Sequence, residues 1–329
     1  MRAVTRVWDW VAGARPRTLP ASLAPVVAGT ASVARPGFGW GQGVIWWRLA
    51  MALVVALALQ VGVNYANDYS DGVRGTDDER RVGPRRLVGS GVARPASVRR
   101  AAVIAGLVAG GAGLALAAAV GWELLIVGAA CLAAGWFYSG GRRPYGYHGW
   151  GEVGVFVFFG FVAAVGSAYV QVGAITARSV WVGVGCGCLS CALLVVNNLR
   201  DIDGDAAAGK RTLAVRLGAA RTRLLYALLV LAGFAALAPL SASRGWPIRG
   251  VLVLGSPALD PIEFAPLTPG EPWPLLGLAA LPLAVGPLWR VLRGYQGPDL
   301  IGVLVATGRL IAAYGLTVAA GLWLAAIMA

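Results

Sequence analysis

Long apolar segments recur along the whole chain, separated by short stretches that hold most of the charged residues. A run of about 20 mainly apolar residues can cross the ~30 Å hydrocarbon core of a bilayer as one helix. Helices satisfy their backbone polar groups internally, so the pattern predicts an all-α membrane protein forming a single polytopic domain over 1–329. Nine spans are expected, at roughly 18–34, 44–66, 99–120, 122–138, 153–172, 180–198, 222–240, 273–290 and 303–327.

Composition supports this prediction and excludes two other classes. The chain is 58% hydrophobic and 13% charged, with a mean hydropathy of +0.69, so a soluble fold would leave more apolar surface than one core could bury. The net charge of +13 does not indicate nucleic-acid binding, because the basic residues lie mainly between the spans and do not cluster on a soluble domain. The chain has 27 arginines and one lysine, Lys210, and this preference for arginine is typical of a bacterium with a GC-rich genome.

The basic residues also predict the orientation in the membrane. Of the 28 lysines and arginines, 23 fall in segments on the same side as the N-terminus. Because basic residues accumulate in cytoplasmic loops, we expect the N-terminus inside a plasma (inner) membrane. The Asp-rich loops 67–98 and 197–221 would then be cytoplasmic, and the Pro- and Gly-rich loop 241–272 would be external.

Two acidic runs carry the candidate chemistry. The first begins at Asn67 and the second at Asn197, and the interval of 130 residues between them also separates Asp71 from Asp201. Carboxylate and amide oxygens suit Mg²⁺, which usually binds together with substrate phosphates. The paired runs therefore predict a Mg²⁺-assisted clamp on a diphosphate, and an enzyme that acts on a lipid substrate.

Helical spacing extends each run into the membrane. Polar residues within membrane helices normally face the bundle interior or a watery cavity. We therefore expect these two stripes to line the wall of one cavity. In the first half the stripe comprises Gln60, Asn64, Asn67 or Asp68, and Asp71, and in the second Ser190, Asn197, Asp201 and Asp205.

Basic residues follow each acidic run closely. Arg74 comes shortly after Asp71, and Lys210 and Arg211 follow Asp205. A cation at this position would neutralise a diphosphate and stabilise it as a leaving group. We expect Asp71, Asp201, Arg74 and Lys210 to be catalytic, and Arg74, Lys210 and Arg211 to bind the diphosphate.

Three other interpretations of the acidic runs fit the sequence less well. Asn and Asp are common helix caps, although two equally spaced clusters are hard to explain in that way. A cation-coupled transporter also uses intramembrane acids, but usually near the bilayer midplane rather than at a helix end. A CDP-alcohol phosphotransferase would need an Ala-Arg pair downstream of Asp71-Gly72, which this chain lacks.

The motifs resemble those of the UbiA superfamily of intramembrane aromatic prenyltransferases. Asn67, Asp68 and Asp71 match its NDxxD motif, and Asp201 and Asp205 match its DxxxD motif. The third acid falls at Asp77 rather than at Gly75, a displacement typical of the branch that prenylates 1,4-dihydroxy-2-naphthoate. The resemblance is carried by RPRTLPASLAPVVAGT from Arg15, NDYSDGVRGTD from Asn67, GPRRLVGSG from Gly83, YSGGRRPYGYHGWGEVGVFVFFG from Tyr138 and NNLRDIDGDAAAGKRTLAVRLG from Asn197.

The resemblance implies about nine helices around a central cavity that opens sideways to lipid. It implies transfer of a polyprenyl chain from its diphosphate to 1,4-dihydroxy-2-naphthoate, with loss of CO₂ and diphosphate, giving demethylmenaquinone. Another acceptor, such as 4-hydroxybenzoate, haem or a sugar phosphate, is the alternative. The implied Mg²⁺ ligands are Asn67, Asp68, Asp71, Asp77, Asn197, Asp201 and Asp205, and the implied substrate-binding residues are Asn64, Arg74, Tyr138, Arg142, Arg143, Tyr145, Lys210 and Arg211.

Overall fold

Helices occupy all nine of the segments in which spans are predicted. A computed structural model describes residues 6–34, 43–75, 86–243 and 272–328, and no strand occurs among them. The all-α prediction is therefore confirmed for the described chain. The helices are α1 (Val7–Gly13), α2 (Pro20–Ala31), α3 (Trp46–Arg74), α4 (Pro95–Val120), α5 (Glu123–Phe137), α6 (Gly151–Val155), α7 (Gly166–Val172), α8 (Ala177–Arg200), α9 (Ile202–Ala207), α10 (Leu213–Ala235), α11 (Leu237–Ala242), α12 (Pro282–Leu292) and α13 (Leu300–Met328).

Length and composition identify fewer membrane crossings in the described chain than the nine predicted. Six of the described helical stretches are long and apolar enough to span a bilayer, and a pair bent by 45°, Trp273–Ala280 with α12, would make a seventh. The helices α2 and α5 are shorter, at 12 and 15 residues. The molecule is a multi-pass membrane protein, and the count of nine spans stays a prediction.

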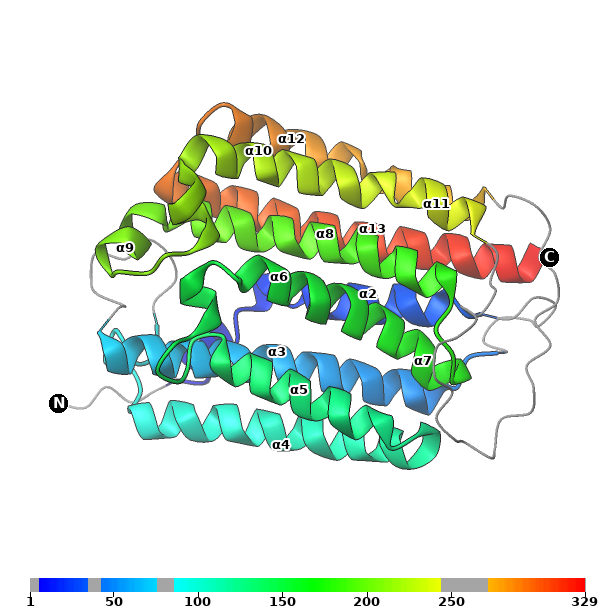
Figure 1. Ribbon diagram of the computed structural model, residues 1–329, viewed down its shortest axis with the longest axis horizontal. Helices are drawn as coiled ribbons and strands as arrows, with labels where there is room; N and C mark the ends of the chain where they lie inside the picture. The colour runs from blue at the N-terminus through cyan, green and yellow to red at the C-terminus, as the bar shows by residue number, and fades with distance from the viewer. Residues whose placement is uncertain (1–5, 35–42, 76–85, 244–271, 329) are drawn as a thin grey trace.

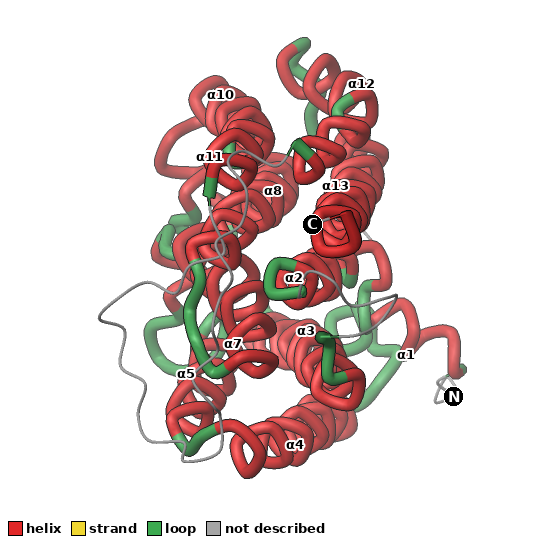
Figure 2. Tube along the Cα trace, turned by 90° about the vertical axis from the view of Figure 1, so that its right-hand side faces the viewer, coloured by secondary structure: helices red, strands yellow, loops and turns green. Residues whose placement is uncertain are grey.

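The long helices run side by side along the length of the molecule (Figure 1). One group contains α3, α4 and α5, and the other contains α8, α10, α12 and α13. Viewed along the helices, α2 and α7 lie between these groups (Figure 2). The largest apolar core joins α2, α8, α10 and α13, with Leu189, Tyr226 and Tyr314 among its buried side chains.

Small residues bring the helices around α8 into close contact. A π-type helical segment, Phe156–Val165, joins α6 to α7, and its Gly160 packs against the backbone of α8. A Cβ atom on Gly160 would lie only 2.6 Å from the carbonyl oxygen of Gly183, so this approach requires glycine. Cys186, Cys188 and Cys191, all on α8, are buried as free thiols in this packed region.

The two acidic runs lie at the same end of the bundle. The first lies on α3, which continues through Arg74 and ends at Gly75, where a φ of 68° suits glycine. The second begins on α8 and continues onto the short helix α9. Part of the predicted loop 67–98 is thus helical, whereas Asp77 and nearly all of the loop 241–272 lie outside the described residues.

Candidate active site

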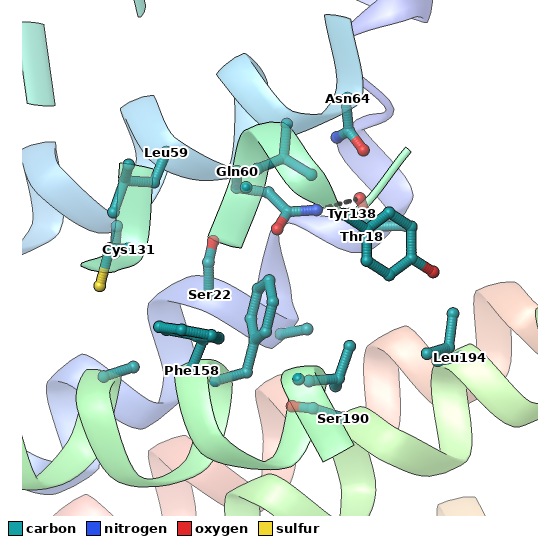
Figure 3. Close-up of a pocket in the computed structure, with 18 of the residues that line it drawn as sticks. Thr18, Ser22, Leu59, Gln60, Asn64, Cys131, Tyr138, Phe158, Ser190 and Leu194 are labelled. Carbon is teal, nitrogen blue, oxygen red and sulfur yellow. Dashed lines mark hydrogen bonds between the residues drawn. The ribbon is translucent and has the colours of Figure 1, made fainter. Parts of the chain in front are cut away.

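A cavity of about 360 Å³ lies inside the bundle and has polar residues at one end. Apolar side chains such as Leu59, Val63 and Phe158 line much of its remaining wall, and Figure 3 shows Leu59 and Phe158 facing the space. The two predicted stripes converge on this one cavity. From the acidic runs, the lining residues are Asn67, Asp71, Asn197, Asp201 and Asp205.

The stripe on α3 occupies one buried helical face, as the spacing predicts. Gln60, Asn64, Asn67 and Asp71 are all buried, and all of them line the cavity. Each is separated from the next by three or four residues, which places them above one another along the helix. The side-chain amide of Asn64 donates to the carbonyl oxygen of Ala14 at 2.9 Å, which ties this face to α1.

Lys210 links the acidic residues of the two halves. Its Nζ atom lies 3.5 Å from Oδ2 of Asp71, on α3, and 3.9 Å from Oδ1 of Asp205, on α9. The same ammonium lies 4.7 Å from the ring centre of Tyr147, whose hydroxyl donates to Oδ1 of Asp71. Carboxylates that are 134 residues apart in the chain are thus close enough to share one cation.

Asp201 is held by its neighbour in the chain. Arg200 donates from Nε to Oδ1 at 2.7 Å and from Nη2 to Oδ2 at 2.5 Å, a bidentate pair that is largely shielded from solvent. Among the described residues, no three His, Cys, Asp or Glu side chains are grouped as a metal site. In this arrangement the protein's own cations, Lys210 and Arg200, contact the carboxylates.

The two adjacent residues that open the first motif have different partners. Oδ1 of Asn67 accepts a hydrogen bond of 2.6 Å from the Ser139 hydroxyl and faces the cavity. Both oxygens of Asp68 instead accept from backbone N–H groups, those of Leu87 and Val88, each at 2.9 Å. Asp68 thereby holds the segment before α4 against α3 and does not line the cavity.

The basic residues predicted to bind substrate divide into two groups. Lys210 lines the cavity, whereas Arg142, Arg143 and Arg211 are exposed and do not line it in the described part of the structure. Arg74 is also exposed, and its guanidinium donates to the carbonyl oxygens of Ser139 and Gly141. The visible contacts of Arg74 therefore hold the loop between α5 and α6.

Two predicted tyrosines lie where that loop meets the cavity. The rings of Tyr138 and Tyr145 meet edge to face, with centres 5.4 Å apart, and both line the cavity. Burial raises the pKa of the Tyr145 phenol to about 12, so this group stays protonated and neutral at ordinary assay pH. Phe158 and Phe159 also line the cavity, whereas Tyr69 packs outside it, against Arg99.

Sequence reasoning missed two residues that contact the acids. Tyr147 joins Asp71, Lys210 and Arg74 through its hydroxyl and its ring, yet it lies far from either acidic run in the chain. Arg200 lies in the second acidic run, directly before Asp201. Its adjacency to Asp201 is the sequence feature that could have identified it. The site defines a class: a multi-pass helical protein whose bundle cavity carries paired Asn/Asp motifs at one end.

Comparison with known proteins identifies the family within that class. The chain matches the UbiA prenyltransferase family over residues 22–301. It is 48% identical over 319 residues to 1,4-dihydroxy-2-naphthoate octaprenyltransferase of Mycobacterium tuberculosis, covering 95% of this chain and 96% of that protein. The enzyme of the same name from Escherichia coli is 35% identical over 80% of this chain and 90% of its own length.

A solved structure shows the same fold. The UbiA homolog from Archaeoglobus fulgidus bound to DMAPP and Mg²⁺ superposes with a TM-score of 0.54 at 13% identity, covering 94% of this chain and 99% of that one. The chain belongs to the UbiA prenyltransferase family, and it is a prenyltransferase. The resemblance predicted from the motifs is thereby confirmed.

Proposed function

We propose that this enzyme transfers a polyprenyl chain from its diphosphate to 1,4-dihydroxy-2-naphthoate, releasing diphosphate and CO₂. Two bacterial relatives, which match 95% and 80% of this chain, are named for this acceptor and support its choice. One structural observation carries the proposal. The ammonium of Lys210 lies between carboxylates from the two motifs at the polar end of an otherwise largely apolar cavity.

The donor set at this end fits Mg²⁺. Asn67, Asp71, Asn197, Asp201 and Asp205 offer only oxygen ligands, and those oxygens suit a hard divalent cation. Lys210 already contacts acids of both halves, so a cation at this position could be shared by the two motifs. When bound, Mg²⁺ would neutralise charge on the diphosphate as it leaves. Asp77 stays a predicted ligand. Asp68, which the resemblance also implies, has both oxygens engaged by backbone N–H groups and would hold the fold rather than the metal.

The residues around the acids would position the diphosphate. Lys210 is close enough to turn its ammonium from Asp71 and Asp205 toward a phosphate oxygen, where it would stabilise the leaving group. The ring of Tyr147 contacts that ammonium, and its hydroxyl donates a hydrogen bond to Asp71. Tyr147 would thus position both groups. Arg74 would act through the loop that it holds, since it contacts the carbonyl oxygens of Ser139 and Gly141.

The remaining cavity suits the prenyl chain and the chemistry of its first carbon. The C–O bond to the diphosphate breaks, and a ring carbon of the acceptor forms a C–C bond to the allylic carbon. Loss of the acceptor's carboxylate as CO₂ returns an electron pair to the ring and restores its aromaticity. The faces of Tyr138, Tyr145 and Phe158 line this space and would stabilise positive charge on the allylic carbon.

The enzyme would work from the cytoplasmic side of a bacterial plasma membrane. Both motifs lie at one end of the bundle, and the basic residues predict that this end faces the cytoplasm. The prenyl diphosphate would reach this end from the membrane, and the soluble aromatic acid would reach it from the cytoplasm.

A prenyl-transfer assay on detergent-purified protein tests this function. The reaction would contain geranylgeranyl or longer diphosphate, Mg²⁺ or EDTA, and either 1,4-dihydroxy-2-naphthoate or 4-hydroxybenzoate. We expect Mg²⁺-dependent formation of the prenylated naphthalenediol, with one CO₂ per product by mass spectrometry. Product from 4-hydroxybenzoate alone would assign the chain to another acceptor, and ion flux without product would favour a transporter.

A further inference from the structure

Two buried polar side chains lie deeper in the cavity than the acidic motifs and are not used by the diphosphate chemistry. Gln60, on α3, is 8% exposed, and Ser190, on α8, is 2% exposed. Both line the cavity, and Figure 3 shows them on opposite sides of its interior. Within the described chain, neither Oε1 of Gln60 nor Oγ of Ser190 has a hydrogen-bond partner.

The hydrogen bonds around Gln60 determine which way its amide faces. Thr18 donates its hydroxyl hydrogen to the carbonyl oxygen of Arg15 at 3.0 Å, so its oxygen can only accept from Gln60. The side-chain NH₂ of Gln60 fills that role at 3.0 Å, drawn as the dashed line in Figure 3. The carbonyl oxygen is therefore the atom left without a partner, and it needs a donor.

The two positions correspond to each other in the two halves of the chain. Gln60 precedes Asp71 by eleven residues, and Ser190 precedes Asp201 by the same interval. Eleven residues advance a helix by about 16 Å, or three turns, so both polar groups lie at a similar depth below the acidic end.

A hydrocarbon chain cannot satisfy these atoms. Burying an unpaired carbonyl or hydroxyl against prenyl carbons is unfavourable, because neither group can recover the hydrogen bonds it makes to water. A hydroxylated aromatic ring supplies what is missing, since its hydroxyl donates and its oxygens also accept. Phe158 and Phe159 line the same cavity and could offer faces to such a ring.

We infer that Gln60 and Ser190 form the ring-oxygen subsite for the aromatic acceptor. Gln60 accepts a hydrogen bond from one ring hydroxyl, and Ser190 bonds a second ring oxygen from the opposite wall. This inference rests on the proposed function, because it specifies the substrate class of the same cavity. It explains why the polar stripes extend deeper than any ligand of the diphosphate would require.

Steady-state kinetics of Gln60→Leu and Ser190→Ala test the subsite, each with 1,4-dihydroxy-2-naphthoate and with 1-hydroxy-2-naphthoate, which lacks one hydroxyl. We expect kcat/KM for the dihydroxy acceptor to fall about tenfold in each variant, the loss of roughly one hydrogen bond. The KM for prenyl diphosphate should not change. The preference of the wild type for the dihydroxy acceptor should shrink in at least one variant.

Ser22→Ala is the matched control. Ser22 also lines the cavity, but its hydroxyl already donates to the carbonyl oxygen of Leu19 at 2.9 Å, so its removal should leave acceptor kinetics unchanged. Ser190→Ala changes little volume and keeps the test available if Gln60→Leu fails to fold. Unaltered acceptor kinetics in Ser190→Ala and in folded Gln60→Leu would mean that water satisfies these atoms, and would overturn the inference. A change confined to the KM for prenyl diphosphate would also overturn it.

The wild-type reaction separates failure of the subsite from failure of the function. If the wild type prenylates only 4-hydroxybenzoate, the proposed acceptor is wrong, and the same variants are measured with that ring instead. A tenfold loss there would still support the subsite. If the wild type prenylates no hydroxylated ring, both the acceptor class and the subsite are rejected.

Discussion

Asp68 and Asp71 are one helical turn apart and yet have different partners. Asp71 contacts Lys210 and Tyr147 at the cavity, whereas Asp68 holds the backbone of Leu87 and Val88. The resemblance to the family's NDxxD motif implied both as metal ligands, whereas helical spacing left open whether Asn67 or Asp68 faces the cavity. The sequence could not show that a segment nearly twenty residues later supplies N–H groups to Asp68.

This difference predicts opposite effects of two conservative substitutions. Asp68→Asn replaces one accepting oxygen by NH₂ against a buried N–H group, so we expect a loss of about 1–3 kcal/mol in stability with most of kcat retained. Asp71→Asn should lower kcat by roughly 10²-fold or more and leave stability nearly unchanged. Thermal inactivation and turnover of the purified variants measure the two effects.

Asp203→Asn provides the control, because Asp203 belongs to the second acidic run but is exposed. It should resemble the wild type in both measurements. If Asp68→Asn instead abolishes turnover at full stability, Asp68 is a direct participant in the chemistry.

The loop between α5 and α6 shows what helix patterns leave undetermined. The lengths of the apolar runs predicted the helices on both sides of it, because a helix of about 20 apolar residues can cross the bilayer. The loop itself is held by Arg74, by the Ser139–Asn67 hydrogen bond and by Tyr147. Such contacts join residues far apart in the chain, and no local pattern encodes them. Tyr147 was missed for this reason.

Arg74→Lys distinguishes a loop-holding arginine from a diphosphate-binding one. Lysine keeps the charge but cannot make the forked pair of hydrogen bonds to two carbonyl oxygens. We expect Arg74→Lys and Arg74→Gln to raise the KM for prenyl diphosphate to a similar extent and to speed hydrogen exchange in residues 139–150. Near wild-type kinetics in the lysine variant alone would show that the charge of Arg74 matters, as the sequence predicted for a substrate-binding residue.

The two halves of the chain bring equivalent polar residues to one cavity. The interval of 130 residues predicted this convergence, and in the structure residues of both motifs line the same cavity. The family and the all-α bundle also followed from the sequence. The number of crossings did not, because α2 and α5 are short and the segment before α12 is bent.

The predicted orientation can be measured with single cysteines in a cysteine-free background. Arg142→Cys, in the α5–α6 loop, should react with a membrane-impermeant maleimide only after cells are opened. Trp122→Cys, in the exposed α4–α5 connection, should react in intact cells. Reversed labelling would place the acidic end of the bundle outside and would contradict a cytoplasmic active site.

Equilibrium binding tests most directly whether the two motifs form a single site. The ligand would be an unreactive prenyl thiodiphosphate, titrated calorimetrically with and without Mg²⁺ into wild type, Asp71→Asn, Asp205→Asn and the double variant. If the acids of α3 and α9 share one cation and one diphosphate, each single variant loses the Mg²⁺-dependent part of binding and the double variant loses no more. Additive losses, or a single variant that binds like the wild type, would show that the motifs act separately.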